Sequence, residues 1–437
     1  MALTTRAIVL GTTAIAIGAV TLMGAGLHLS AGSSLLRNNT NSPKELVDEV
    51  WQVIDHNYVD GTFNQKDWQA IRRQYLDRNY ANKQEAYNAI REMLKTLDDP
   101  YTRFMDPTEF KNMRIDTSGE LTGVGIQLAA DETTKKLTVV APIEDSPAFK
   151  AGIRSKDMIV KIDEQSTEGM DVNKAVTLIR GPVGTQVKLT IQRGSQSLTF
   201  DLRRDKIEIH PVRASVQAGS MGNVGYVRLV QFSAPAVREM RDAIKKLEGQ
   251  GVTGYVLDLR SNPGGLLEAS VEIARMWMKE GGIVVTVDRQ GGDDRRSANG
   301  SALTDKPLVV LVDGGSASAS EILAGALQDN KRAKIIGTRT FGKGLVQSVR
   351  ELSADGDESG LAVTIAKYLT PNRRDINKHG IDPDVEIKLT EEQQKFLSQE
   401  REKIGTPSDP QFAKALQILG QEITAKRAEI PAASKPK

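Results

Sequence analysis

The segment that begins at Pro43 has apolar residues at helical intervals. They fall on one face of a predicted helix at Leu46, Val47, Val50, Trp51 and Ile54. A second helix-like stretch covers residues 83–97 and stops at the sequence LDDPYTRFM. The pattern predicts a small helical region over residues 43–105.

From about residue 106 to residue 205 the pattern becomes typical of β-structure. The segments GVGIQLAA, KLTVVAPI and MIVKIDEQ are predicted strands, and DVNKAVTLIRG is a predicted helix. VKLTIQR and SLTFDLRR flank Gly194-Ser195 as a hairpin. These elements predict a domain of five or six strands, which is large enough to fold on its own.

Residues 206–389 alternate buried strands, glycine-rich turns and amphipathic helices. The strand GYVLDLR leads through SNPGG to the helix LLEASVEIARMWM, and PLVVLVD leads through GGSA to SEILAGALQDN. A third strand, AKIIG, leads into TRTFGKG. This order predicts an α/β core with parallel strands. Residues 390–437 are charged and helix-forming, so they are expected to form a C-terminal helical tail.

The N-terminus carries a run of 21 residues without charge, Ala7–Leu27. As a helix it is long enough to cross a hydrocarbon core of about 30 Å. The run is long and no good A-x-A site follows, which favours an uncleaved anchor over a cleaved signal peptide. A buried core helix is the remaining alternative. Arg6 then places the rest of the chain outside the cytoplasm, and residues 1–42 are expected to form the anchor and a polar tether.

The amino-acid composition limits the nucleophiles, metal sites and binding partners that the protein can have. The formal net charge is +2 over 437 residues, which does not suggest a nucleic-acid-binding protein. The chain has no cysteine, so a thiol nucleophile, thiolate zinc sites and disulfides are excluded. It has only four histidines. A nucleophile would have to be a hydroxyl, with few histidines to serve as its base.

The stretch DGGSASASEILAGAL, residues 313–327, holds the candidate nucleophile. Ser318 and Glu321 fit the S-x-x-E capping box, which satisfies the first N–H groups of a helix. The same serine follows a buried strand, at the edge where α/β folds bind their ligands. The positive helix N-terminus there stabilises an alkoxide or oxyanion. On this pattern alone, both a helix cap and a nucleophile remain open.

A nucleophilic serine needs a base, and Lys343 is better placed than any histidine. It follows the strand AKIIG, so it lies at the same edge of the sheet as Ser318. To act as a base its pKa must fall from about 10.4 to roughly 7–8, through burial among apolar groups such as Phe341 and Leu345. Gln347, four residues on, is a candidate to orient it. A solvated loop lysine is the alternative.

Two further motifs surround this pair. Residues 337–343 match the phosphate-loop pattern G-x-x-x-x-G-K, but Gly344 stands where Ser or Thr should hold magnesium, which disfavours nucleotide binding. The turn NPGG, residues 262–265, follows the strand GYVLDLR and opens a helix. The N–H groups of Gly264 and Ala319 are therefore candidates for a two-donor oxyanion hole.

Together these motifs resemble the carboxyl-terminal processing peptidases, also called tail-specific proteases. The resemblance covers roughly Pro43 to Leu389 in motif order and spacing, and it implies a ClpP/crotonase-like protease core. It further implies that Ser318 is the nucleophile, Lys343 the general base and Gln347 its orienting partner. The N–H groups of Ala319 and Gly264 would bind the oxyanion, and no metal or cofactor is needed.

The same resemblance identifies residues 106–205 as a PDZ-like domain. Such domains bind a chain end by adding it as a strand to their sheet. Gly123, Val124, Gly125 and Ile126 resemble the loop that captures the carboxylate. Arg180 resembles a residue that couples peptide binding to the active site in some relatives. The stretch YVDGTFNQKDWQAIRRQYL resembles cyanobacterial and plastid members, some of which trim a photosystem reaction-centre subunit in the thylakoid lumen.

The sequence therefore predicts a membrane-tethered, extracytoplasmic serine endopeptidase, placed in a periplasm or thylakoid lumen. Its partners would be protein substrates, bound by their C-termini, and a membrane. The α/β fold would combine an N-terminal helical region, the PDZ-like domain, a protease core over residues 206–389 and the tail. A PDZ scaffold that binds peptides without cutting them is the alternative function. The sequence leaves the oligomeric state open.

Overall fold

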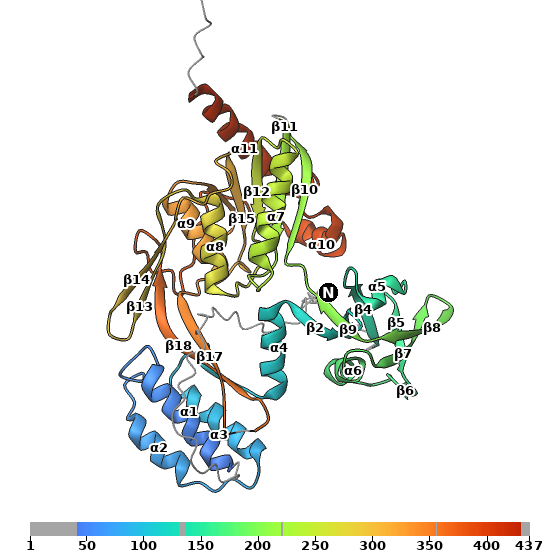
Figure 1. Ribbon diagram of the computed structural model, residues 1–437, viewed down its shortest axis with the longest axis vertical. Coiled ribbons are helices and arrows are strands. Elements are labelled where there is room, and N and C mark those ends of the chain that lie inside the picture. The colour runs from blue at the N-terminus through green and yellow to red at the C-terminus, as the bar shows by residue number, and fades with distance from the viewer. Residues whose placement is uncertain (1–41, 131–135, 220–221, 355, 430–437) are drawn as a thin grey trace, which may run out of the picture. The chain divides into compact units, whose positions relative to one another are not determined.

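The computed structural model describes residues 42–130, 136–219, 222–354 and 356–429 (Figure 1). The described chain forms two compact units, residues 112–211 and the remainder. The predicted mixed α/β architecture is confirmed, with a β-rich unit and a larger α/β unit. Helix α4 (Pro107–Ser118) contains the boundary between the two units.

Three helices begin the larger unit: α1 (Pro43–Asn57), α2 (Trp68–Leu76) and α3 (Lys83–Lys95). Side chains of Ser42, Asp67 and Asn82 accept hydrogen bonds from the first N–H groups of these helices, which fixes where each begins. Their apolar faces enclose the stacked rings of Trp51 and Trp68. The helices pack on Leu361 and Val363 of strand β18 (Gly360–Leu369), so this region shares a core with the rest of its unit.

The core of the larger unit is a six-stranded sheet. Across the sheet its strands are β10 (Val212–Gly219), β11 (Gly222–Leu229), β12 (Gly254–Asp258), β15 (Leu308–Val312), β16 (Lys334–Gly337) and β19 (Val385–Glu386). All neighbouring pairs are parallel except β10 and β11. The parallel strands β12, β15 and β16 are those that the alternating sequence pattern predicts.

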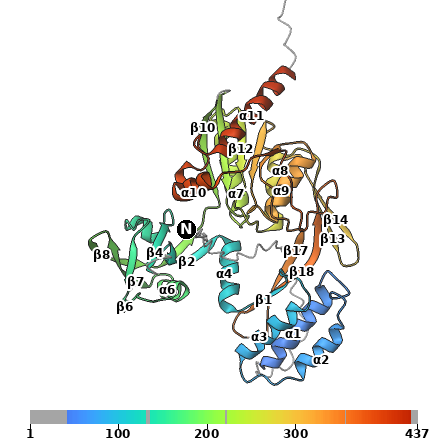
Figure 2. The ribbon, with the colours of Figure 1, turned by 180° about the vertical axis from the view of Figure 1, so that it is seen from behind.

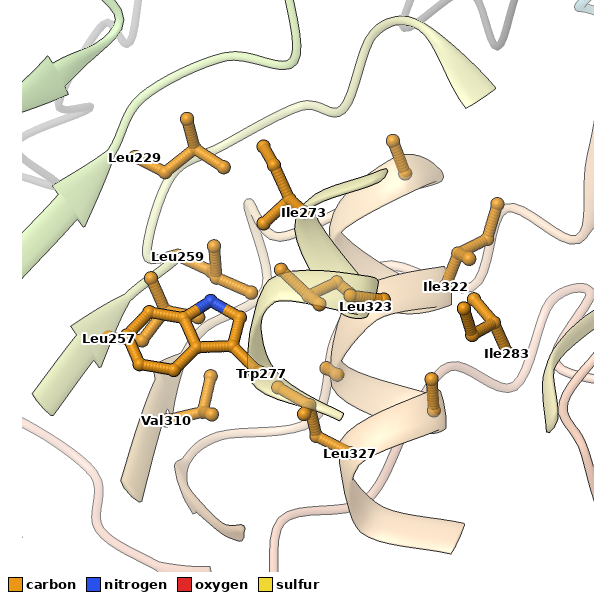
Figure 3. Packing of buried hydrophobic residues seen from close by; sticks show 14 of the residues in the cluster. Leu229, Leu257, Leu259, Ile273, Trp277, Ile283, Val310, Ile322, Leu323 and Leu327 are labelled. Atoms are coloured by element: carbon orange, nitrogen blue, oxygen red, sulfur yellow. The ribbon is translucent and has the colours of Figure 1, made fainter. Parts of the chain in front are cut away.

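Helices cover both faces of this sheet. Alternate residues of β12 and β15 pack against α7 (Ala236–Gly249), α8 (Leu267–Trp277) and α9 (Ala319–Asp329), where Trp277 and Leu323 fill the centre of the cluster (Figure 3). The intervening residues, such as Val256 and Val309, pack against α11 (Pro410–Glu429). This helix runs along the sheet near β12 (Figure 2). Burial on both faces explains why these strands are continuously apolar.

A second sheet lies in the same unit. It contains β1 (Arg103–Met105), β18, β13 (Gly282–Asp288) and β14 (Asp293–Ser297) in that order, and β17 (Leu345–Glu351) also pairs with β18. The segment that carries Gln347 is therefore a strand. The tail adds α10 (Glu391–Gln399) and a short 3₁₀ turn, Arg401–Lys403, before α11.

The smaller unit, residues 112–211, contains a six-stranded sheet and a two-stranded ribbon. The sheet comprises β3 (Ile126–Ala130), β4 (Leu137–Pro142), β5 (Met158–Ile162), β7 (Gln186–Arg193), β8 (Gln196–Arg203) and β6 (Gln165–Ser166), with α5 (Pro147–Lys150) and α6 (Val172–Ile179) beside it. The ribbon pairs β2 (Glu120–Gly123) with β9 (Asp205–Glu208). The predicted hairpin at Gly194-Ser195 is confirmed as β7 and β8.

Among residues 42–429 as far as they are described, the structure contains no helix that is both long and apolar enough to cross a membrane. The predicted anchor Ala7–Leu27 lies outside the described residues.

Candidate active site

Ser318 lies where the turn after β15 enters α9. It is the N-cap residue of that helix and is fully buried. Its backbone has φ 57° and ψ −114°, a conformation that residues other than glycine rarely adopt. Strained backbone of this kind persists where the surrounding structure over-determines it, and it is common at functional sites.

The turn after β12 lies directly against the serine. A Cβ atom added at Gly264 would lie 2.9 Å from Ser318 Cβ and 3.0 Å from Ala319 N, so only glycine allows this approach. Asn262 joins the two turns, because its carbonyl oxygen accepts from Ala317 N–H at 3.0 Å. The adjacency of the two strand-end turns follows from the parallel pairing of β12 with β15.

The two candidate oxyanion donors differ in what they contact. The Gly264 N–H donates to the side-chain oxygen of Asn262 at 2.9 Å, so in this structure it already has an acceptor. Ala319 is the first residue of α9 and lies at the positive end of that helix.

Lys343 lies in the loop between β16 and β17, and only 1% of its surface is exposed. Burial lowers the pKa of its ammonium from 10.5 to about 7, and the positive charge of Arg103 acts in the same direction. The carboxylates of Asp99 and Glu321 oppose that shift. The pKa of Lys343 therefore lies in the range that a lysine needs in order to act as a base near neutral pH.

The side chains that bury the lysine are not all those expected. Phe341 is 57% exposed, so the expectation that it shields Lys343 is wrong, and Leu345 is only partly buried. Tyr101, from the loop before β1, covers the ammonium instead, with its ring centre 4.8 Å from the Lys343 Nζ. Tyr101 is distant from Lys343 in sequence. It reaches the lysine because the helical region packs on β18, which pairs with β17.

Glu321 connects the serine and the lysine through their backbones. Its Oε2 accepts from the N–H groups of Ser318 at 2.8 Å and of Lys343 at 2.9 Å. Its Oε1 accepts from the Thr340 hydroxyl at 2.6 Å and from the Gly342 N–H at 2.7 Å. Burial raises the pKa of this carboxyl, and the four donors act against that rise. The residue predicted as half of a capping box therefore also holds the lysine loop.

Tyr368, on β18, makes a second connection between the same two segments. Its hydroxyl lies 3.1 Å from the carbonyl oxygen of Ser318 and also contacts the carbonyl oxygen of Lys343. The phenol is buried, and that burial raises its pKa well above the ordinary value. It therefore stays protonated and donates, and Ser318 and Lys343 are held together through both their N–H and their C=O groups.

Gln347 lies on β17 with its side chain buried. Its Nε2 donates to the Thr364 hydroxyl oxygen at 3.3 Å, while its Oε1 has no hydrogen-bond partner among the described residues. The three histidines that the structure describes, His56, His210 and His379, are exposed, unlike the buried serine.

The predicted peptide-binding loop lies in the smaller unit, between β2 and β3. Gly125 has φ 79° and its carbonyl oxygen accepts from the Ser146 hydroxyl at 3.2 Å, while Val124 is buried. Among the described strands, β3, which follows, pairs with β4 alone and is therefore an edge strand. Arg180 ends α6 and donates to the Asn112 side chain at 2.9 Å.

Comparison with known proteins agrees with this arrangement. The sequence model for peptidase family S41 matches residues 223–387, and that for the PDZ domain matches residues 138–193. A carboxyl-terminal-processing protease of Synechocystis sp. is 45% identical over 416 residues, which cover 94% of this chain and 95% of the relative. The chain belongs to peptidase family S41. It is therefore a serine peptidase and not a binding scaffold without activity.

A plant relative and a solved structure also resemble this S41 peptidase. The chloroplastic carboxyl-terminal-processing peptidase 2 of Arabidopsis thaliana is 42% identical over 348 residues, covering 77% of this chain and 67% of the relative. A solved structure named photosystem II D1 C-terminal processing protease superposes with a TM-score of 0.55 at 39% identity, covering 85% of this chain and 99% of that one.

A buried ionic cluster supports the Gly264 turn of this S41 peptidase. The Arg260 guanidinium donates to Asp258 at 2.6 Å and to Asp409 at 2.7 Å, and both carboxylates are fully buried. Arg260 lies two residues before Asn262, and Asp409 immediately precedes α11. The C-terminal tail is therefore joined through an ion pair to the segment between β12 and the turn that holds Gly264.

No local sequence pattern pointed to Tyr101, Tyr368 or the charge pair Arg260–Asp409. The tyrosines lie in ordinary-looking segments, and only the pairing of β1 and β17 with β18 brings them to the site. A polar residue inside a buried strand was the available signal for Asp258 and Tyr368. Nothing in the sequence indicated which groups they contact.

Proposed function

We propose that this S41 peptidase cleaves proteins near their C-termini with Ser318 as nucleophile and Lys343 as general base. One observation carries the proposal most directly: Lys343 is buried with a pKa of about 7, and its backbone shares the Glu321 carboxylate with Ser318. A lysine with that pKa is substantially neutral near pH 7 and can accept a proton.

In the proposed reaction the Ser318 oxygen attacks the scissile carbonyl carbon as its proton passes to Lys343 Nζ. The carbonyl oxygen becomes an oxyanion, which the Ala319 N–H and Gly264 N–H groups stabilise. The C–N bond then breaks, and Lys343 gives its proton to the leaving amine. Water then attacks the acyl-enzyme carbonyl carbon as its proton passes to Lys343. The ester C–O bond breaks, and Lys343 returns the proton to the Ser318 oxygen, which restores the serine hydroxyl and releases the new C-terminus.

Two features of the site must change during this cycle. The Gly264 N–H must share or leave the Asn262 oxygen to reach an oxyanion. Ser318 and Lys343 are 0% and 1% exposed, so a substrate must displace what covers them. Gln347 Oε1, buried without a partner among the described residues, is the proposed acceptor for the charged lysine.

Substrate recognition is proposed for the smaller unit. A substrate C-terminus would add as a strand to the edge of β3, with its carboxylate at the N–H groups of Gly123–Ile126. The edge position of β3 and the left-handed Gly125 support this role. Arg180 is proposed to respond to the bound peptide. The names of the relatives, which process carboxyl termini, favour a C-terminal substrate segment.

We further propose that the protein works outside the cytoplasm, held at a membrane by Ala7–Leu27, in a periplasm or thylakoid lumen. Its domains would be the anchor and tether 1–42, the helical region 43–105, the PDZ domain 106–205, the peptidase core 206–389 and the tail 390–437. The relative named for photosystem II D1 processing suggests the C-terminal extension of that reaction-centre subunit as a substrate.

The experiment compares the full-length chain with Ser318→Ala and Lys343→Ala on an unfolded reporter protein that has an apolar C-terminus. The parent should cleave, and each variant should lose at least about 10³-fold in kcat. Lys378→Ala, which removes an exposed lysine near the site, is the matched control and should cleave like the parent. Cleavage by Ser318→Ala at the parent rate would reduce Ser318 to a helix cap and overturn the proposal.

A further inference from the structure

The loop between α3 and β1, residues 96–102, reaches the proposed base through Tyr101. Tyr101 places its ring centre 4.8 Å from Lys343 Nζ, a distance at which an aromatic ring attracts an ammonium. Asp99 and Arg103, two residues to either side, both act on the charge of the same lysine. This short segment therefore presents a ring, a carboxylate and a guanidinium to one catalytic group.

A chain of hydrogen bonds leads from this loop to Gln347. The Thr364 hydroxyl lies 2.7 Å from Asp99 Oδ2, and its oxygen accepts from Gln347 Nε2 at 3.3 Å. The Thr102 hydroxyl also donates to Asp99 at 2.7 Å, and the Thr364 N–H donates to Thr102. Asp99 is thus held by two threonines, one of which contacts the glutamine.

The direction of this chain follows from the chemistry of its members. An ionised carboxylate can only accept hydrogen bonds, so the Thr364 hydroxyl must give its proton to Asp99. The Thr364 oxygen is then left to accept, and of the two ends of the Gln347 amide only the NH₂ group can donate to it. The Gln347 Oε1 is consequently the end that remains available, and it is buried without a partner among the described residues.

We propose that Asp99 and Tyr101 are positioning residues for the base: Asp99 fixes the amide of Gln347 through Thr364, and Tyr101 holds the charged Lys343. The proposal rests on the Ser318/Lys343 function given above. Lys343 becomes an ammonium when it takes the serine proton, at a position where only 1% of its surface is exposed. The Gln347 oxygen, the Tyr101 ring and the Asp99 charge all stabilise that state, whereas Arg103 favours the neutral lysine before reaction.

The groups that face Lys343 make this arrangement testable by charge. They are Asp99, Tyr101 and Arg103 from the loop and β1, Glu321 from α9 and Tyr368 from β18. Asp99 raises the pKa of Lys343 and Arg103 lowers it. Removing the first charge should therefore move the lysine's titration to lower pH, and removing the second should move it to higher pH.

The test measures kcat and kcat/KM of the full-length protein from pH 5.5 to 9.5 for the parent, Asp99→Asn and Arg103→Gln. Asp99→Asn should shift the rising limb by about half a unit to one unit toward acid and lower the maximal kcat by about 10-fold. Arg103→Gln should shift the limb by a similar amount toward alkali. Shifts of opposite sign from one short segment are not expected of a loop that only supports the fold.

Two further variants separate the ring from the hydroxyl. Tyr101→Leu should lose about 10-fold or more in kcat, and Tyr101→Phe, which keeps the ring, should recover most of that loss. Thermal unfolding of each variant shows whether it folds. Because Arg103→Gln leaves the threonine chain intact, it still tests the proposal if Asp99→Asn is unstable.

The outcomes separate this inference from the proposed function. If the parent has a limb near pH 7 that neither charge variant moves, the positioning role is wrong and the Ser318/Lys343 mechanism stands. If Lys343→Ala retains parental activity, the proposed function itself fails. Equal losses of kcat in Tyr101→Leu and Tyr101→Phe would show that the Tyr101 ring does not hold Lys343.

Discussion

The backbone N–H groups of Ser318 and Lys343 donate to the same oxygen atom, Oε2 of Glu321, at 2.8 and 2.9 Å. The two residues lie 25 positions apart, one at the start of a helix and one in a loop. Because a single buried carboxylate accepts from both, the loop cannot move from the helix without leaving N–H groups unsatisfied. Such an arrangement would fix the spacing between the proposed nucleophile and its proposed base.

Glu321→Gln tests this connection. The amide keeps the shape but offers one accepting oxygen, so its NH₂ group must face two of the four donors. We expect a loss of about 2–4 kcal/mol in the free energy of unfolding and about 10²-fold in kcat. Denaturant unfolding and peptide cleavage measure the two effects. Glu386→Gln, at an exposed position, is the control, and equal behaviour of the two variants would contradict the role of Glu321.

Lys343→Met should raise stability in a pH-dependent way. In the folded chain the pKa of Lys343 is about 7, below its ordinary value of 10.5, so the unfolded chain binds the proton more tightly. The free energy of unfolding of the parent then rises with pH between about 7 and 10.5. Below pH 7 the folded chain carries the full cost of burying the charged lysine. Since each pKa unit is worth about 1.4 kcal/mol, the variant gains at most about 5 kcal/mol below pH 7.

Thermal unfolding from pH 6 to 10 measures that gain, which should shrink as the pH rises. Lys378→Met changes an exposed lysine and should show no such trend. A gain for Lys343→Met that stays constant with pH would show that its folded pKa is not lowered.

Asp409→Asn should weaken both the fold and the active site. It takes one of two carboxylates from the buried Arg260, and breaking a buried ion pair costs about 3–5 kcal/mol. Because Arg260 immediately precedes the turn that holds Gly264, kcat should also fall. Asp305→Asn is the matched control, since Asp305 pairs with Lys426 of α11 but is 95% exposed, and it should change little. If Asp409→Asn unfolds like the parent, the tail does not support this turn.

The sequence predicted the parts of the site that depend on local order. Apolar strands followed by glycine-rich turns indicated β12 and β15, and parallel pairing then required Gly264 and Ser318 to be neighbours. The position of Lys343 after β16 followed from the same pattern. Strand periodicity and turn chemistry suffice for such inferences because they are properties of short segments.

The sequence did not predict contacts made through the second sheet. Phe341 was expected to shield the lysine because it is a near neighbour in the chain, yet it points outward and Tyr101 takes that place. Glu321 was recognised only as a cap, since its bonds to the Lys343 loop depend on tertiary packing. Residues brought together by β17 and β18 carry no local signal of their partners.

The pH dependence of kcat/KM for the parent protein is the sharpest test of Lys343 as the general base. If neutral Lys343 is the base, cleavage should rise about tenfold per pH unit below about pH 7 and level off above it. Lys343→Ala should lose both the activity and the limb. A parental profile that is flat between about pH 6 and 9 would contradict the claim that Lys343 takes the serine proton.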